Sequence, residues 1–239
     1  MATFEPGVDR PLLLVASTPM EVRGLIRIEA AQTTGAWPVV EVSPSLTVVV
    51  SGVGRANAAA ATAYALSRRF HPYVVNVGIA GALPGGGLEI GDVVVATESV
   101  FFEEGIDLPE GPCGMESLGF ELGASPWAEW NRLLIEESTV QSLLARLPAP
   151  VRRGQVATVA RCSGTDRWAL SVVRQTGALA EAMEGAAVVL AARRMGAVAA
   201  EVRVISNTCG HRSRQRWDLA LALERLSAVI DAMTGHTGR

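Results

Sequence analysis

The chain has 239 residues, of which 49% are hydrophobic, and its formal net charge at pH 7 is −3. It is long enough for a substantial core, and we expect residues 1–239 to form one domain. All 21 basic residues are arginines, so a side-chain Schiff base and the lysine of a phosphate-binding P-loop are excluded. Carboxylates outnumber the scattered arginines, so no basic stripe indicates a nucleic-acid partner.

The cysteines and the N-terminus favour a reducing compartment. An odd number of cysteines stands at wide spacings with no C-x-x-C pair: Cys113, Cys162 and Cys209. Carboxylates precede a short apolar run at the N-terminus, whereas a signal peptide has a basic start and a longer apolar core. No stretch approaches the roughly 20 apolar residues that span a bilayer. We therefore expect a cytoplasmic protein with no membrane partner.

The first half of the chain predicts alternating strands and helices. A buried strand is expected over residues 12–16, followed by a helix over 19–31 that Pro19 opens and a hairpin over 39–50. An alanine-rich helix then ends near Phe70, and a second buried strand covers residues 73–77. The glycine-rich segment 78–92 is expected to be a loop whose backbone can approach a ligand closely. A strand over residues 93–97 then resumes the sheet.

The second half begins with a long segment, 101–128, that has no clear periodicity. Such a loop is typical of a lid or a binding loop, although a disordered surface insertion is an open alternative. Helices are expected over 131–147, 165–175, 186–195 and 216–233, and strands over 155–161 and 199–206. This alternation indicates an α/β fold.

Several chemistries are disfavoured by the sequence. The histidines, His71, His211 and His236, lack partners at ligand spacing, so we expect no metal site and place them at the surface. No G-x-S-x-G motif is present, and Ser163 lacks the context of a nucleophile elbow. The SGVGRAN segment is only a partial match to a phosphate-binding turn. No cofactor is expected.

The run from Glu181 to Asn207 is the most informative part of the chain. It places Met183, Glu184, Arg203 and Asn207 at the ends of an apolar helix and a strand. Ligands of open α/β sheets bind at such ends. Together these side chains could hold a ribose and a purine. Alternatively, Glu184 could simply satisfy free amides at a helix N-terminus.

Four motifs in register resemble the nucleoside phosphorylase and nucleosidase superfamily: ASTPMEV at 16–22, NVGIAG at 76–81, EAMEGAA at 181–187 and VRVISN at 202–207. The resemblance implies a three-layer α/β sandwich with a mixed central sheet and a nucleoside substrate. It also implies a homodimer in which the partner's loop can help to close each site. Glu21 falls on the position of the water-activating carboxylate. The implied substrate-binding residues are Ala80, Gly81, Phe102, Met183, Glu184 and Arg203.

Asn207 departs from the adenine-releasing nucleosidases, which carry an aspartate at that position. A carboxylic acid can protonate N7 of adenine, a step typically worth about 10² to 10⁴ in rate, whereas an amide cannot. Its NH₂ and carbonyl instead suit O6 and the protonated N7 of a 6-oxopurine. We therefore expect hypoxanthine or guanine as the base, with Asn207 and Glu21 as the catalytic residues.

Glu21 also indicates which nucleophile is used. Its carboxylate would repel phosphate but can activate water, so hydrolysis is expected rather than phosphorolysis. The serine that can hold water in related hydrolases is replaced by Ile79, so Glu21, Arg203 or backbone groups must hold it. A chain that combines this fold with Glu21 and Asn207 resembles hydrolases that release hypoxanthine from a nucleoside carrying a carboxyphenyl group. Phe101, Phe102 and Ile106 are candidates for the wall around that group, or else core residues. A methylthioadenosine or adenosylhomocysteine nucleosidase, a 6-oxopurine phosphorylase and a non-catalytic nucleoside sensor remain alternatives.

Overall fold

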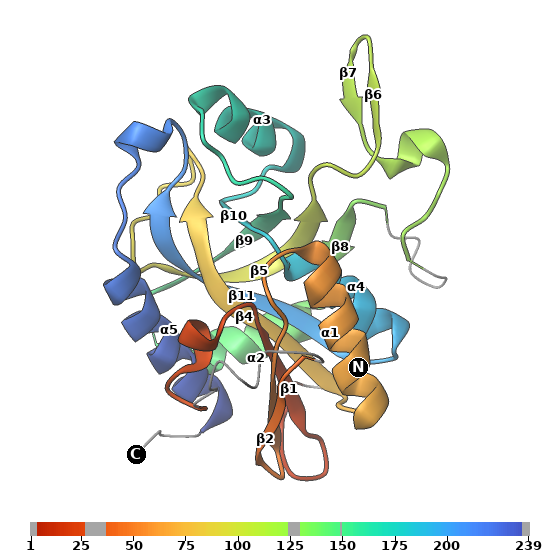
Figure 1. Ribbon diagram of the computed structural model, residues 1–239, viewed down its shortest axis with the longest axis vertical. Coiled ribbons are helices and arrows are strands. Elements are labelled where there is room, and N and C mark those ends of the chain that lie inside the picture. Colours follow the sequence, from red (N-terminus) through yellow and green to blue (C-terminus); the bar gives the residue numbers. More distant parts are fainter. Residues whose placement is uncertain (1–3, 27–36, 124–129, 149, 236–239) are drawn as a thin grey trace.

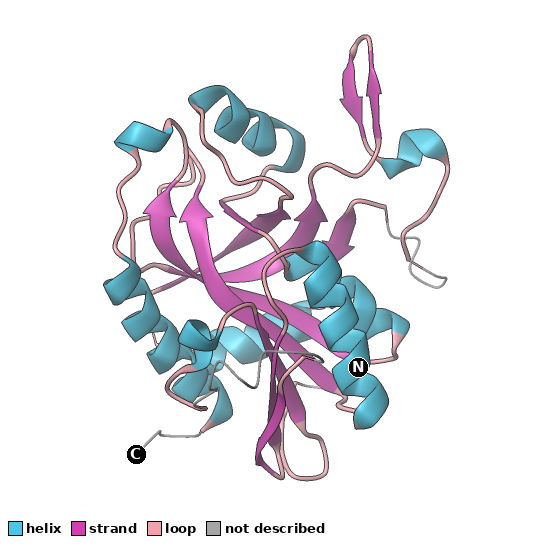
Figure 2. Ribbon diagram, viewed as in Figure 1, coloured by secondary structure: helices cyan, strands magenta, loops and turns pink. Residues whose placement is uncertain are grey.

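The computed structural model describes residues 4–26, 37–123, 130–148 and 150–235, and it shows a mixed β-sheet with helices on both faces (Figures 1 and 2). The strands run in the order β10-β9-β5-β11-β4-β1-β3-β2, with β8 beside β5. Their bounds are β1 (Leu12–Ala16), β2 (Val39–Ser43), β3 (Leu46–Val50), β4 (Tyr73–Ala82), β5 (Val93–Phe101), β8 (Arg132–Leu134), β9 (Val151–Thr158), β10 (Ala180–Ala182) and β11 (Val198–Thr208).

The α-helices form the two outer layers. Helices α1 and α4 pack together on one face, while α2 and α5 cover the other and α3 packs on β9. Their bounds are α1 (Arg55–Arg68), α2 (Glu137–Arg146), α3 (Asp166–Thr176), α4 (Gly185–Arg194) and α5 (Leu219–Thr234). None of the helices in the described part of the chain is long and apolar enough to cross a membrane. The predicted α/β arrangement with a mixed central sheet is confirmed.

Strand pairing brings distant segments together at one end of the sheet. Strand β4 pairs parallel with β1 and β11, so their carboxyl ends point the same way. Strand β10 pairs parallel with β9 and antiparallel with β4. Strands β4, β11, β5, β9 and β10 therefore close into a ring, which the sequence pattern did not predict.

The core is built from apolar strands. Strand β1 is buried along its whole length, as its apolar run predicts, and β3 is buried as well. One large apolar cluster spans both helical layers, and a smaller one lies beneath α3. That residues 1–239 form a single domain remains a prediction.

The helix predicted over residues 19–31 is wrong in its described part. A short 3-10 helix, η1 (Pro19–Val22), replaces it. The Glu21 side chain folds back onto the amides of Ser17 and Thr18. Close packing of Gly24 on α5 accompanies the early end, because a Cβ at Gly24 would lie 2.7 Å from Ser227 Oγ. Residues 27–31 lie outside the described residues.

The helix predicted over 131–147 is wrong in its first part, where strand β8 precedes α2. Asn131 bridges two segments by donating to the carbonyls of Phe101 and Glu104, and β8 then pairs with β5. Tertiary pairing here overrides local helix propensity. Strand β9 also begins and ends earlier than predicted, and β4 continues to Ala82, so the first glycines of the expected loop lie within a strand.

The segment predicted to be irregular contains regular structure. Strands β6 (Ile106–Leu108) and β7 (Gly111–Cys113) form a hairpin that stands away from the sheet, followed by a 3-10 helix, η3 (Met115–Leu118) (Figure 1). Residues 124–128 lie outside the described residues. A last 3-10 helix, η4 (Arg212–Arg214), connects β11 to α5.

Candidate active site

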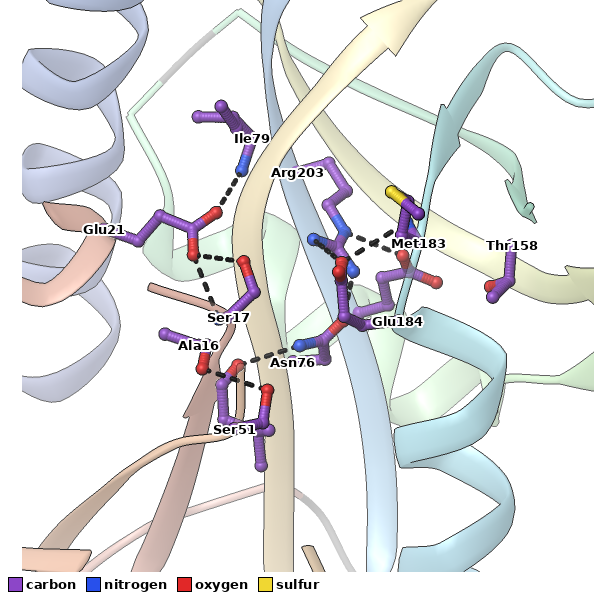
Figure 3. Close-up of polar contacts among 12 residues, drawn as sticks. Ala16, Ser17, Glu21, Ser51, Asn76, Ile79, Thr158, Met183, Glu184 and Arg203 are labelled. Atoms are coloured by element: carbon purple, nitrogen blue, oxygen red, sulfur yellow. Dashed lines mark hydrogen bonds and ion pairs between the residues drawn. The ribbon is translucent and has the colours of Figure 1, made fainter. Parts of the chain in front are cut away.

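Glu21 is a buried carboxylate held by five hydrogen bonds. The side chain, on η1, accepts at Oε2 from the amides of Ser17 and Thr18, each at 2.9 Å, and from their hydroxyls at 2.7 and 3.3 Å. Its Oε1 accepts the Ile79 amide at 3.1 Å (Figure 3). These five bonds hold the Glu21 carboxylate in one orientation, and the backbone of Ile79 contributes one of them.

Arg203 lies in the middle of β11 rather than at its end, which corrects the predicted position. It is 1% exposed. Its Nε donates to Glu201 Oε1 at 2.8 Å, and its Nη2 donates to Asn76 Oδ1. The other oxygen of Glu201 accepts from Ser99 Oγ at 2.5 Å. These bonds hold the guanidinium in one orientation, and Glu201 compensates its buried charge.

Glu184 is a buried carboxylate that faces Arg203. Its Oε1 accepts the Gly54 amide at 3.0 Å, and its Oε2 lies 3.5 Å from Arg203 Nη1 (Figure 3). The half-buried Met183 donates its amide to Glu184 Oε2 at 3.3 Å. Burial raises the pKa of Glu184, while the positive charge of Arg203 opposes that shift. Unused lone pairs on both oxygens can accept ribose hydroxyls.

The alternative in which Glu184 caps a helix is wrong. Glu184 is the residue before α4, but its side chain makes no capping bond to that helix. The Thr158 hydroxyl accepts the Ala186 amide instead, at 2.8 Å. The Glu184 carboxylate is thus free of a capping role and points toward Arg203.

Gly78 creates the space in which these groups meet. Gly78 and Arg203 are register partners on β4 and β11. A Cβ at Gly78 would lie 2.6 Å from Glu21 Oε1 and 2.7 Å from Arg203 Nη1. A glycine is therefore required for Glu21 and the Arg203–Glu184 pair to converge on one point.

Asn207 lies near the end of β11, after a β-bulge between Ile205 and Asn207 that re-aims the strand. Its Oδ1 accepts from Ser206 Oγ at 2.9 Å, and its Nδ2 donates to the Thr208 carbonyl at 3.1 Å. An amide has two N–H groups and two lone pairs on oxygen, so one of each remains for a ligand. Its register partner is Gly81. The neighbouring Ala80 is buried and accepts from Ser206 Oγ through its carbonyl.

Phe102 lies beside a pocket of about 800 Å³ rather than against Glu21 or Arg203. Its ring packs edge-on against Trp168, with 5.4 Å between ring centroids. Arg161 stacks on the same Trp168 ring, and Ile106 also lines the pocket. Phe101 also lines the pocket, although it is buried and belongs to the larger core cluster. Phe102 and Trp168 give the pocket an aromatic surface; that this surface forms a wall around a substrate group remains a prediction.

Some residues of this site were missed by the sequence analysis. Asn76 and Glu201 are fully buried, and Glu201 is two residues from Arg203, which places both on one face of β11. The signal was available, because each interrupts an otherwise apolar strand. Gly54 and Ile79 act through their backbone amides, for which residue type gives no signal.

The expectation of no metal site stays a prediction. Across the described ranges, no cluster of three or more histidine, cysteine or carboxylate residues could hold a metal ion. The surface location predicted for His71 is wrong, because its ring is buried and contacts the Arg69 carbonyl and the Thr47 hydroxyl, each at 2.8 Å. His211 is exposed, and His236 lies outside the described residues.

The mixed sheet between two helical layers is the fold of the nucleoside phosphorylase class of proteins. The family model described as "Phosphorylase superfamily" matches residues 18–234, and the chain belongs to this superfamily. Within it, the chain belongs to the family of the futalosine hydrolases. It is 42% identical over 187 residues to the futalosine hydrolase of Acidothermus cellulolyticus, covering 78% of this chain and 74% of that protein.

Two further relatives support this family. The futalosine hydrolase of Streptomyces coelicolor is 34% identical, covering 78% of this chain and 76% of its own length. That of Thermus thermophilus is 31% identical, covering 79% and 80% respectively. Among solved structures, a 5'-methylthioadenosine/S-adenosylhomocysteine nucleosidase from Neisseria meningitidis superposes with a TM-score of 0.72 at 18% identity, covering 94% of this chain and 98% of that one. This last similarity concerns the fold alone.

Proposed function

We propose that the protein hydrolyses the N-glycosidic bond of futalosine, releasing hypoxanthine and dehypoxanthinyl futalosine. The observation that carries the proposal is the convergence at Gly78 of Glu21 with the Arg203–Glu184 pair, in a chain 31–42% identical to three futalosine hydrolases. The reaction belongs to menaquinone biosynthesis, the pathway in which futalosine is an intermediate.

Water is the proposed nucleophile. Glu21, Glu184 and Glu201 surround the single guanidinium of Arg203, so the formal charge of this group is negative when the carboxylates are ionised. Such a site disfavours a phosphate dianion, because like charges repel in a medium of low dielectric constant. A neutral water beside Glu21 has no such cost.

In the proposed step, the water oxygen forms a bond to C1′ of the ribose while the C1′–N9 bond breaks. The electron pair of that bond goes to the purine, and Glu21 takes the proton of the water. Glu184 holds the ribose hydroxyls, and its charge stabilises the positive charge that develops on the sugar. Arg203 keeps Glu184 in place and does not touch the reacting atoms.

Asn207 is proposed to hold the base as it departs. Its remaining N–H donates to O6, and its remaining carbonyl lone pair accepts N7–H once N7 has gained a proton from solvent. Adenine presents an amino donor at position 6 and benefits from an acid at N7, which an amide cannot supply. Asn207 therefore favours hypoxanthine.

The pocket beside Phe102 is proposed to take the group attached to the ribose 5′ carbon. Phe102 and Trp168 offer aromatic surface for a carboxyphenyl ring. The pocket lies near the ribose site, because Glu103 of its lining is 3.6 Å from Arg55, which follows Gly54, the residue whose amide binds Glu184.

A cytoplasmic homodimer is part of the proposal. The three cysteines are free thiols, which suits a reducing compartment. The hairpin of β6 and β7 stands away from the sheet and exposes Ile106 and Leu108 (Figure 1), so a second copy could cover it. Light scattering coupled to size exclusion tests the dimer, which predicts a mass of twice the 25.1 kDa of the chain.

Base release from futalosine, inosine and methylthioadenosine tests the proposed substrate. Chromatography should show hypoxanthine from futalosine as the fastest reaction. Adenine from methylthioadenosine at a comparable rate would mean that the role given to Asn207 is wrong. Tight nucleoside binding without base release, unchanged by Glu21→Gln, would instead identify a sensor.

A further inference from the structure

Glu201 is a buried carboxylate that has no role in the proposed reaction step. Its side chain, on β11, is fully buried. Both of its oxygens are occupied, because Oε1 accepts from Arg203 Nε at 2.8 Å and Oε2 accepts from Ser99 Oγ at 2.5 Å. Burying a charge costs free energy that only such bonds offset. Arg203 is therefore bound by a second carboxylate in addition to Glu184.

Gly185 provides the space for the Glu201 carboxylate. Gly185 is the first residue of α4 and directly follows Glu184. A Cβ at Gly185 would overlap the Glu201 carboxylate, so this carboxylate packs against the backbone of the first helical turn. The N-terminus of a helix carries a partial positive charge, which favours an anion there. Glu201 and Glu184 therefore approach the same guanidinium from neighbouring places, one against the start of α4 and one immediately before it.

The two carboxylates hold Arg203 unequally. Its Nε donates to Glu201 at 2.8 Å, whereas Nη1 lies 3.5 Å from Glu184 Oε2, beyond the usual range of about 2.7–3.2 Å for an N–H···O bond. Asn76 accepts from Nη2 (Figure 3) and is itself fixed, because its Nδ2 donates to the Val15 carbonyl at 2.8 Å. Glu201 and Asn76 thus occupy Nε and Nη2, and Glu184 receives only the electrostatic attraction of Nη1.

We propose that Glu201 is a positioning residue that competes with Glu184 for Arg203 and so leaves the Glu184 oxygens open to the ribose hydroxyls. This inference rests on the proposed function and adds the residue on which the role of Glu184 depends. Without the charge of Glu201, the guanidinium would be drawn toward Glu184. A movement of about 0.6 Å, from 3.5 Å to the typical length of about 2.9 Å, would form a charge-assisted hydrogen bond. Because Glu184 Oε2 already accepts from the Met183 amide, that bond would take its remaining lone pair.

The experiment compares the wild type with Glu201→Gln. A glutamine has the shape of a glutamate, and it can accept from Arg203 Nε and donate to Ser99 Oγ, but it carries no charge. Inosine, 2′,3′-dideoxyinosine and hypoxanthine are measured as competitive inhibitors of futalosine hydrolysis, which is followed by the release of dehypoxanthinyl futalosine. The dideoxy compound lacks both ribose hydroxyls, and hypoxanthine lacks the ribose altogether.

The ratio of the two nucleoside inhibition constants reports how well the hydroxyls are bound. A hydrogen bond to a charged group is worth about 10- to 100-fold in affinity, so the wild type should bind inosine more tightly than 2′,3′-dideoxyinosine by at least this factor. In Glu201→Gln the ratio should fall toward one. The inhibition constant of hypoxanthine should not change.

Ser99→Ala is the matched control, because it removes a hydrogen bond to Glu201 but leaves the charge. It should keep the ratio of the wild type. Glu201→Asp keeps the charge but withdraws it by one methylene group, so its ratio should fall partway. This second variant also decides the question if Glu201→Gln does not fold, because a wild-type ratio in Glu201→Asp would overturn the inference.

A Glu201→Gln variant that melts at a lower temperature but keeps the wild-type ratio would also overturn it, since Glu201 would then only compensate a buried charge. So would a wild type with a ratio of one, because Glu184 would then not bind the ribose hydroxyls. A wild type that does not hydrolyse futalosine contradicts the proposed function itself, and direct binding of the same three ligands by calorimetry then tests the inference alone.

Discussion

Gly78→Ala perturbs the point at which the proposed catalytic groups meet. The new Cβ would lie 2.6 Å from Glu21 Oε1 and 2.7 Å from Arg203 Nη1, whereas ordinary contact begins at 3.4 Å. Glu21 is held by five hydrogen bonds, and Arg203 by Glu201 and Asn76. To reach 3.4 Å, Glu21 Oε1 must move away from the new Cβ by about 0.8 Å and Arg203 Nη1 by about 0.7 Å, unless the backbone of residue 78 shifts.

A displacement of about 1 Å at a catalytic group costs on the order of 10² in rate. Overpacking costs about 1–3 kcal/mol of stability, and each kcal/mol lowers the melting temperature of a domain of this size by about 2–4 °C. We therefore expect kcat/KM for hypoxanthine release from Gly78→Ala to fall about 100-fold, with a melting temperature about 2–12 °C lower.

The assay is steady-state release of hypoxanthine from futalosine, with melting followed by calorimetry. Gly7→Ala is the control, because a Cβ there meets nothing within 4 Å, and it should leave both quantities unchanged. A Gly78→Ala variant with the kcat/KM of the wild type would refute the reasoning, since Glu21 and Arg203 would then not need to converge.

Three further predictions concern single side chains. Glu21→Gln should lower kcat about 10² to 10⁴-fold without weakening hypoxanthine binding. Steady-state kinetics measure kcat, and calorimetry measures the binding of hypoxanthine. An unchanged kcat would exclude Glu21 as the base. Burial raises the pKa of Glu184, so the stability it contributes is present below its unfolded pKa and is lost as pH rises through the raised value. The melting temperature of the wild type minus that of Glu184→Gln should therefore fall as the pH rises above 4.5, the ordinary pKa of a glutamate, and a difference that grows with pH would contradict this. Asn207→Asp should shift the ratio of adenine release to hypoxanthine release about 100-fold toward adenine, because an aspartate provides an acid at N7 of the base. Chromatography of both bases measures this ratio. An unshifted ratio would count against the role of Asn207.

The sequence predicted the strands of the core because long apolar runs with β-branched residues have few alternatives. It failed for residues 19–26 and 131–136, where tertiary contacts decide the local structure. Glu21 folds onto the preceding amides, and Asn131 bridges carbonyls that are distant in the sequence. Local propensity contains no information about either contact.

The candidate site was predicted in part. Glu21, Glu184 and Arg203 could be named because charged residues in fixed motifs are visible in a sequence. The space at Gly78 could not be predicted, because it depends on the register between β4 and β11. The amides of Gly54 and Ile79 were also hidden, since every residue of the chain except proline has one.

Hypoxanthine release from futalosine in buffer free of phosphate tests the central claim most directly. The account predicts release at the same rate with and without added phosphate, and no sugar phosphate by ³¹P NMR, because water attacks C1′ beside Glu21. Release that requires phosphate and yields a sugar 1-phosphate would contradict it.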